Sequence, residues 1–462
     1  MKTTFTCFLL TITVSLILTI TLYAQKQNIK GCDVSFVNYV EGFGGTFKLN
    51  GEVKDPFDIY TNAGINTARL RIWHTPSSSH SSLKETLLLA QRAKSKGMKI
   101  LLDIHYSDSW ADPANQTLPK AWQSLSFASL KDSVAAYTQM VLREFKKVGC
   151  FPEFIQIGNE ITCGMLWNFG RVCDGYNSPQ QWKQLGELLD TAIVVYRAEA
   201  PNKDSAEVMI HIDRGGDPAG AKWFFENLKK QNVAFDIIGL SYYPWWHGNL
   251  NALQRTLDTL TQLFPQKILI AETAYPFSLN WCDNTGNIVG LQSQLLPGYP
   301  ATLEGQSQYL QQVTSLVSAL PNNRGMGVVY WASDWICATG ASSSWENLAL
   351  FDFNGNVLPA LKEWNAQTAI EETELVKTTQ VGFYPNPFTE TTTLSLPTNF
   401  AGNTSLHLYS LTGEKIEEIQ SEHTGFSENL ATINGSHLSP GVYFVSVYLN
   451  NQFYKTYKIV KL

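Results

Sequence analysis

The chain has 462 residues, too many for one hydrophobic core of ordinary size, so its length indicates one large and one small globular unit. Its residues are 44% hydrophobic and 16% charged, which excludes a disordered chain. The formal net charge is −6 and no block of Lys or Arg is present, which argues against nucleic acid or an anionic membrane surface as the main partner.

The first 24 residues have the pattern of a signal peptide. Lys2 supplies a short positive region, residues 5–23 are mainly apolar, and Ala24 offers a small residue at the cleavage site before Gln25. An uncleaved membrane anchor is the alternative, because the apolar run approaches the length that spans a bilayer. We favour cleavage, since no basic flank follows, and expect a mature chain without a membrane span.

Six cysteines follow the signal peptide, an even number that suits an exported protein with disulfides. Cys163 and Cys173 lie in one Gly-containing loop and form the first candidate pair. Cys282 and Cys337 form the second if their loops are neighbours. The spacings do not resemble a zinc site, so no metal ligands are assigned. The other two cysteines are expected to be buried free thiols: Cys32 and Cys150.

Between residues 25 and 366, short β-rich runs alternate with amphipathic helical patterns. The runs are continuously apolar, as in parallel strands that are buried on both faces. Eight such units predict an α/β fold, a (β/α)₈ TIM barrel with enlarged loops that forms the catalytic domain. An open doubly wound sheet is the alternative, weakened because no Gly-rich phosphate loop follows the first strand. The predicted strands are 30–37, 67–73, 98–105, 153–158, 207–212, 235–242, 267–272 and 326–332.

Two helical patterns between these strands are clear. In the first, Ser82 and Glu85 have the spacing of a capping box, and Gly97 suits the end of the helix. The second covers residues 178–202.

The sequence changes character after the barrel. Residues 367–380 are polar and acidic without a clear apolar face and are predicted to be a linker. Residues 381–462 contain short alternating strands separated by turn residues, which predicts a small all-β sandwich. Its predicted strands are 391–398, 404–416, 428–433, 441–451 and 452–462.

In a (β/α)₈ barrel the functional groups gather at the carboxyl ends of the strands. The opposite ends of the same strands carry no comparable groups. The strand-end residues are Arg71, Trp73, His74, Asp103, His105, Asp108, Trp110, Asn159, Glu160, His211, Asp213, Tyr242, Tyr243, Trp245, Trp246, His247, Glu272, Trp331, Asp334 and Trp335.

Two glutamates stand out in this set, because Glu is rarely buried without a partner or a task. Glu160 ends the fourth strand and Glu272 ends the seventh, and these strands face each other across a barrel. Two facing carboxyls suit glycoside hydrolysis, in which one protonates the leaving oxygen and the other attacks the anomeric carbon. A structural ion pair is the alternative for either Glu alone, but the two together favour catalysis.

The neighbouring strand-end groups are predicted to bind substrate. Arg71 is expected to hold the nucleophile ionised, and Tyr242 to hydrogen-bond it. Asn159 is expected to donate to a sugar 2-hydroxyl, His105 to bind a sugar hydroxyl, and Trp331 to form the floor of the reacting-sugar subsite. Taken singly, an aromatic or His side chain is more often a core residue. The remaining candidates are Asp108 and the stacking platforms Trp73, Trp110, Trp245, Trp246 and Trp335.

The motifs IGNE (157–160) and IAETAYP (270–276) resemble the catalytic motifs of the large retaining glycosidase clan with (β/α)₈ barrels. Further motifs from Gly31 to Trp364 resemble glycoside hydrolase family 53, the endo-β-1,4-galactanases. The resemblance implies Glu160 as acid/base and Glu272 as nucleophile, with retention of configuration. It also implies β-1,4-galactan or type I arabinogalactan as the polysaccharide substrate, without a required cofactor. These motifs are GCDVSFV, GINTARLRIW, LLDIHYSDSWADPANQTLPKAW, IGLSYYPWWHG and WENLALFDFNGNVLPAL.

The C-terminal motifs FYPNPF (383–388) and LYSLTGEKI (408–416), with residues 438–462, resemble the type A sorting domain of the type IX secretion system. The resemblance implies secretion machinery as a partner and export from a Gram-negative, Bacteroidetes-type cell to its surface or surroundings. A carbohydrate-binding sandwich with an exposed aromatic row is the alternative. Its candidate residues, which fit either interpretation, are Tyr443, Phe444 and Tyr448.

Two details depart from the family pattern. Some bacterial members bind calcium in the loops after the seventh and eighth strands. Here Asp283, Asn284 and Asn287 offer oxygen ligands but not a full set, so calcium is expected at most as a structural ion. Ala332 and Ser333 stand where many relatives have Glu-Pro, which leaves the sugar contacts at that position open.

The sequence leaves two other functions open. The barrel could act on another β-glycan such as mannan or xylan, or the chain could be a non-catalytic glycan-binding surface protein. The presence of both glutamates favours an enzyme, and we expect it to act as a monomer.

Overall fold

The computed structural model describes residues 28–202, 206–364, 382–395, 401–410, 414–424, 430–449 and 452–462. The predicted signal peptide, residues 1–24, and the predicted linker, residues 367–380, lie outside the described residues. The chain divides into two compact units, Met1–Trp364 and Asn365–Leu462.

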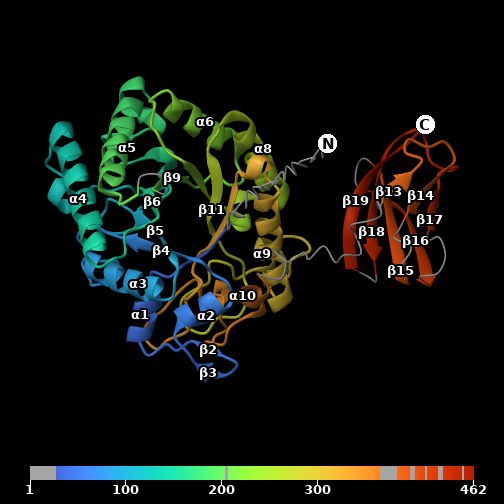
Figure 1. Ribbon diagram of the computed structural model, residues 1–462, viewed down its shortest axis with the longest axis horizontal. Coiled ribbons are helices and arrows are strands. Elements are labelled where there is room, and N and C mark those ends of the chain that lie inside the picture. The colour runs from blue at the N-terminus through green and yellow to red at the C-terminus, as the bar shows by residue number, and fades with distance from the viewer. Residues whose placement is uncertain are drawn as a thin grey trace, which may run out of the picture. The chain divides into compact units, whose positions relative to one another are not determined.

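Eight parallel strands close into a barrel in the first unit (Figure 1). The ring closes where the first strand pairs with the last, with Ile29 opposite Gly327. All eight predicted strands are confirmed, and closure excludes the open doubly wound sheet. The strands are β1 (Ile29–Asp33), β4 (Thr67–Ile72), β5 (Lys99–Ile104), β6 (Phe154–Ile157), β9 (Glu207–Ile212), β10 (Ile237–Ser241), β11 (Lys267–Thr273) and β12 (Gly325–Tyr330).

Helices surround this barrel and cover its strands (Figure 1). Two short hairpins lie in its loops: β2 (Lys48–Leu49) with β3 (Glu52–Val53), and β7 (Gly164–Met165) with β8 (Gly170–Arg171). The helices are α1 (Val37–Gly42), α2 (Pro56–Asn62), α3 (Leu83–Ser95), α4 (Phe127–Lys147), α5 (Pro179–Glu199), α6 (Pro218–Lys229), α7 (Pro244–His247), α8 (Leu250–Leu263), α9 (Leu303–Ser318) and α10 (Pro359–Glu363). Among the described residues, every helix is too short or too polar to cross a bilayer.

Helix α3 begins where the sequence predicts it, although the capping box is confirmed only in part. Ser82 Oγ accepts a hydrogen bond from the Glu85 amide at 3.3 Å. The reciprocal bond is displaced by one residue, because Glu85 Oε2 accepts from the Ser81 amide. Gly97 has φ +77°, the left-handed conformation that commonly follows the end of a helix.

The barrel interior has an apolar floor and a polar layer above it. Leu101 and Met209 belong to the buried apolar floor. Side chains alternate along a strand, so the next inward positions on the same strands are Asp103 and His211, both fully buried. The barrel therefore holds a buried polar layer just below the carboxyl ends of its strands.

Both predicted disulfides are confirmed. Cys163 pairs with Cys173 within the segment between β6 and α5. Cys282 pairs with Cys337 and joins the loops that follow β11 and β12. The remaining two cysteines are buried free thiols, as predicted: Cys32 and Cys150.

The second unit consists of two antiparallel sheets around a shared apolar core. Leu394 and Ile433 come from one sheet, and Val445 and Ile459 from the other, which confirms the predicted all-β sandwich. One sheet has the order β13 (Gly382–Tyr384), β14 (Thr391–Ser395) and β17 (Leu430–Asn434). The other has the order β16 (Lys415–Thr424), β15 (Ala401–Tyr409), β18 (Gly441–Leu449) and β19 (Gln452–Lys461).

Candidate active site

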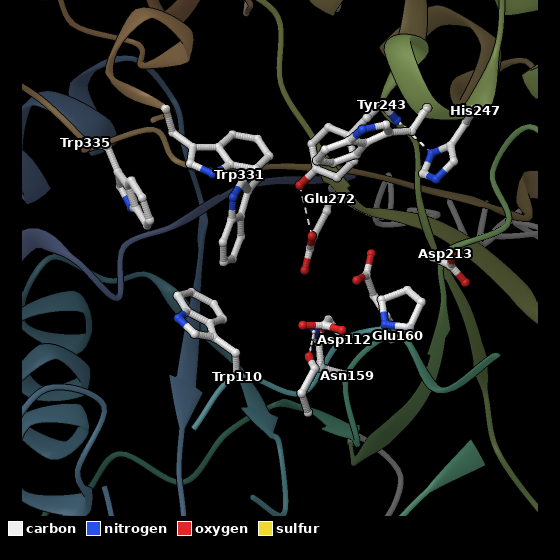
Figure 2. A pocket seen from close by; sticks show the side chains of 14 residues that line it. Trp110, Asp112, Asn159, Glu160, Asp213, Tyr243, His247, Glu272, Trp331 and Trp335 are labelled. Atoms are coloured by element: carbon white, nitrogen blue, oxygen red, sulfur yellow. Dashed lines mark hydrogen bonds between the residues drawn. The ribbon is translucent and has the colours of Figure 1, made fainter. Parts of the chain in front are cut away.

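A cavity of about 440 Å³ lies at the carboxyl ends of the barrel strands (Figure 2). Strand β11 and the loops that follow five other strands contribute to it, and both predicted catalytic glutamates are in its lining. The lining residues are Trp110, Ala111, Asp112, Pro113, Asn159, Glu160, Asp213, Tyr243, Trp246, His247, Glu272, Trp331, Trp335 and Trp345.

Glu272 reaches the cavity because β11 is irregular at its end. The register of β11 shifts against both of its neighbours near this residue. Ala271 packs into the apolar floor, so strict alternation would turn Glu272 away from the interior. The bulge brings both residues inside. There Glu272 Oε1 lies 2.8 Å from Arg69 Nη2, and Oε2 accepts a hydrogen bond from the Tyr243 hydroxyl at 2.9 Å.

Glu160 follows β6 in a left-handed backbone conformation, with φ +47° and ψ +49°. Such a conformation costs free energy for a residue other than Gly, and residues that keep it are concentrated at functional sites. The side chain lies over the cavity, beside Glu272 (Figure 2). Ser241 Oγ donates a hydrogen bond to Glu160 Oε1 at 2.6 Å.

The two carboxyls differ in their electrostatic surroundings. Burial raises the pKa of Glu160 well above its usual range, and the charges of Glu272 and Asp213 raise it further. Burial also raises the pKa of Glu272, but Arg69 and the Tyr243 hydrogen bond oppose that shift. These surroundings favour the protonated form of Glu160 and favour ionisation of Glu272 first.

The arginine that pairs with Glu272 is Arg69, which corrects the role predicted for Arg71. The Arg69 guanidinium is fully buried and also pairs with Asp33 at 3.0 Å and with Asp103 at 2.9 Å. Both arginines occupy inward positions on β4, two residues apart, so the alternation of the strand does not distinguish them. Arg69 is the deeper of the two and belongs to the buried polar layer.

Arg71 makes different contacts. Its Nε donates to Ser81 Oγ at 3.1 Å, and its Nη2 lies 2.9 Å from His80 Nε2. It is buried behind the cavity wall rather than exposed in the cavity lining.

The hydroxyl that contacts Glu272 comes from Tyr243, which corrects the prediction for Tyr242. The Tyr242 hydroxyl donates instead to the carbonyl of Gly248 at 2.8 Å. Adjacent residues at a strand end face opposite sides of the sheet. A prediction of the inward-facing position that is wrong by one residue therefore exchanges the two tyrosines.

Three further residues predicted to bind substrate belong to the structure behind or beside the cavity. His105 is buried, with Nε2 3.1 Å from Asp103 Oδ2 and Nδ1 accepting from Trp73 Nε1 at 3.3 Å. Trp73 is likewise mostly buried. Asp108 accepts hydrogen bonds from two backbone amides, one of them Thr75. All three lie outside the cavity lining, and their roles in substrate binding stay predictions.

Most of the predicted stacking platforms line the cavity. Trp110, Trp335 and the predicted subsite floor Trp331 lie on one side of it, to the left of the two carboxyls in Figure 2. Trp246 also lines the cavity and is 56% exposed, so its ring is accessible rather than part of the core. Trp245 is not in the lining, and its ring packs 5.3 Å from that of Tyr243.

Asn159 is placed as predicted, next to Glu160. Its Oδ1 accepts from Arg69 Nη2 at 2.9 Å and from Gln156 Nε2 at 3.0 Å. Its Nδ2 donates to the carbonyl of Ala111 at 2.8 Å, which leaves the second amide proton for a ligand in the cavity.

The residues predicted to offer oxygen ligands to calcium take part in loop contacts, Asn287 Oδ1 is buried without a hydrogen-bond partner in the described part of the chain, and a structural calcium ion stays a prediction. Asp283 Oδ1 accepts from the Thr285 amide and Oδ2 from the Ser343 amide, so this carboxylate ties two loops together. Asn287 donates to the carbonyl of Asn280. In the described part of the chain, no three or more His, Cys, Asp or Glu side chains gather where they could hold a metal ion.

Four important residues were not predicted: Arg69, Ser241, Asp112 and Trp345. Arg69 and Ser241 lie at inward strand positions, so a strand-by-strand count of inward residues would have found them. Asp112 and Trp345 lie in long loops after β5 and β12, where no periodic pattern indicates which side chains face the cavity.

Comparison with known proteins supports the same chemistry. The model described as glycosyl hydrolase family 53 matches residues 29–364, and the model described as secretion system C-terminal sorting domain matches residues 382–461. The chain is 34% identical to the arabinogalactan endo-β-1,4-galactanase of Cellvibrio japonicus, covering 71% of this chain and 88% of that protein. It is 32% identical to the endo-β-1,4-galactanase of Bacillus subtilis, covering 73% and 85%. The solved Ignisphaera aggregans GH53 catalytic domain matches with a TM-score of 0.69 at 34% identity, covering 73% of this chain and 95% of that one.

Proposed function

The chain belongs to glycosyl hydrolase family 53, and from this premise we propose that it cleaves β-1,4-galactosidic bonds within galactan and type I arabinogalactan, with retention of configuration. Relatives named as β-1,4-galactanases support the substrate. The observation that carries the proposal is the pair formed by Glu160 and Glu272, which line one cavity and differ in how far neighbouring groups favour ionisation.

In the first step the ionised Glu272 carboxylate attacks the anomeric carbon of a galactose unit, and the bond to the leaving oxygen breaks. Glu160 donates its proton to that oxygen, so the leaving galactan departs as an alcohol. Arg69 and Tyr243 stabilise the charged form of Glu272 before the attack.

In the second step Glu160 is ionised and takes a proton from an incoming water molecule. The water oxygen attacks the anomeric carbon of the galactosyl-enzyme and releases Glu272 as a carboxylate. Two inversions at the same carbon give overall retention. The free Nδ2 proton of Asn159 is available to the sugar 2-hydroxyl, a contact that strengthens in the transition state.

The test compares glutamate variants on linear β-1,4-galactan. Glu160→Gln keeps the shape of the acid but removes its proton, and we expect kcat to fall about 10²- to 10⁴-fold. Glu272→Gln removes the nucleophile and should abolish turnover while galactan still binds. Turnover that survives in Glu272→Gln would contradict the assignment.

Proton NMR of the first products tests the stereochemistry, because retention predicts the β-anomer of the new reducing end. An α-anomer would reject retention. Reducing-sugar release from mannan and xylan, measured beside galactan, separates this proposal from another β-glycanase. Absence of release from all three would favour a glycan-binding protein instead.

We further propose that the second unit directs export from a Gram-negative cell, to the cell surface or to the surroundings. The match of residues 382–461 to a sorting domain supports this role over a carbohydrate-binding one. The two inner residues of β18, Val445 and Val447, are buried. The Tyr448 ring packs against that of His407 within the same sheet.

A further inference from the structure

Arg71 is a buried cation that the proposed mechanism does not use, and aromatic rings surround its guanidinium group. Its side chain is fully buried behind the cavity wall, and its Nη1 has no hydrogen-bond partner. The guanidinium carbon lies 4.1 Å from the ring centroid of Trp110 and 5.8 Å from that of Trp331, both of which line the cavity. Two further rings complete the enclosure: Phe36 at 4.7 Å and Trp73 at 5.2 Å.

The polar contacts of Arg71 fix its orientation from the opposite side. Nε donates to Ser81 Oγ, and Nη2 lies 2.9 Å from His80 Nε2. A guanidinium can only donate hydrogen bonds, so His80 Nε2 accepts and the proton of the neutral ring is on Nδ1. His80 Nδ1 lies 3.3 Å from Glu85 Oε2 at the start of α3.

We infer that Arg71 is a positioning residue that holds Trp110 and Trp331 as rigid stacking walls for the sugar, and that His80 holds Arg71 in place. The inference rests on the proposed function, since it concerns the binding of the same glycan. A cation against a desolvated tryptophan face is attractive, and it restricts the ring to one orientation. A wall that is rigid before the sugar arrives lowers the conformational cost of binding.

This role predicts a particular kinetic pattern. Loss of Arg71 should weaken the binding of ground state and transition state alike, because the walls contact the sugar in both. We therefore expect Arg71→Met to raise KM for β-1,4-galactan about five- to twentyfold, with kcat within about twofold of its original value. Arg71→Lys keeps the charge but loses the planar fork, so it should recover only part of the affinity.

His80 supplies a second and less disruptive pair of variants. His80→Gln retains an oxygen that accepts from Arg71 Nη2, so KM should stay near the original value. His80→Leu has a similar bulk but no acceptor, and should raise KM in the same direction as Arg71→Met. Rescue by Gln but not by Leu is a result that simple loss of packing would not produce.

Arg92→Met is the matched control in the full-length protein. Arg92 also lies against an aromatic ring, with its guanidinium carbon 4.9 Å from the Phe57 centroid, but the Phe57 ring does not line the cavity, unlike Trp110 and Trp331. Thermal unfolding of each variant shows how much stability it loses. Arg92→Met should leave KM unchanged even if its midpoint of thermal unfolding falls as far as that of Arg71→Met.

An unchanged KM in Arg71→Met, or equal effects of Gln and Leu at position 80, would overturn the inference. A fall in kcat at constant KM would overturn it as well. Failure of the original chain to cleave galactan would instead overturn the proposed function, so the two failures are distinguishable.

Discussion

Tyr243 donates one hydrogen bond to Oε2 of Glu272, the proposed nucleophile. Because this bond stabilises the carboxylate, it lowers the pKa of Glu272 and opposes the effect of burial. Tyr243→Phe should therefore raise that pKa and move the acidic limb of the kcat/KM profile to higher pH, by about half a unit to one unit. Activity should fall most at low pH. The pH dependence of kcat/KM on galactan measures the shift.

Tyr242→Phe is the matched control for that measurement, since its hydroxyl contacts the Gly248 carbonyl rather than the carboxyl pair. Its acidic limb should stay where it is. A shift in Tyr242→Phe and none in Tyr243→Phe would restore the assignment that the sequence suggested.

We expect Glu346 to make stability depend on pH. Its side chain is buried, and neither carboxylate oxygen has a hydrogen-bond partner. Burial and the nearby Asp283 raise its pKa from 4.5 to about 7. The unfolded chain loses this proton first, so the contribution of Glu346 to stability falls as pH rises from about 4.5 to about 7 and is constant above.

Glu346→Gln removes this charge. We expect it to stabilise the protein by up to about 3 kcal/mol at pH 8, with a much smaller gain at pH 4.5. Chemical denaturation at the two pH values measures the difference. An equal effect at both would show that Glu346 is not a source of the pH dependence.

Two disulfides that close loops of different length join segments of the first unit. Cys282 and Cys337 are 55 residues apart in sequence, whereas Cys163 and Cys173 are 10 apart. The longer closed loop restricts the unfolded chain more strongly, by about 4 against about 3 kcal/mol in the chain-entropy model. Replacing Cys282 and Cys337 by Ser should therefore lower the free energy of unfolding more than replacing Cys163 and Cys173. Denaturant titration of the two double variants checks the order.

The strands could be predicted from the sequence because each is a continuous apolar run, and their carboxyl ends showed where the site lies. Glu160 and Glu272 were found in this way. What alternation could not show was which of two neighbouring positions faces inward once a strand is irregular. The bulge at the end of β11 turns Glu272 into the cavity. The choices between Arg69 and Arg71, and between Tyr242 and Tyr243, likewise depend on depth and register rather than on residue type.

Loop residues were a second part of the site that the sequence could not predict. Trp345 lines the cavity although it follows the end of β12 by fifteen residues. Its place depends on how a long loop folds back, which no periodic pattern in the chain describes. Local sequence thus located the two carboxyls in the cavity better than it located the walls around them.

The whole molecule consists of two units with separate cores. All residues that line the cavity lie between positions 110 and 345, within the first unit. A chain that ends at residue 366 should therefore fold and keep kcat and KM for galactan within about twofold of the full-length values, because a unit with its own core can fold alone.

The same truncated chain tests the second unit, because it should no longer leave the producing cell. Activity assays on cell fractions and on the medium measure both properties. Secretion of the truncated chain at its normal level would contradict the sorting role, and loss of its activity would contradict the independence of the barrel.

The pairing of β1 with β12 has a consequence for biosynthesis. Ile29 finds its partner near Gly327, almost three hundred positions later, so the ring cannot be sealed until nearly all of the first unit has left the ribosome. Contacts this distant make the last stage of assembly slow compared with the pairing of neighbouring strands. Residues 382–461 are translated after that closing strand. The sorting domain is therefore synthesised only on chains that already contain all eight strands of the barrel.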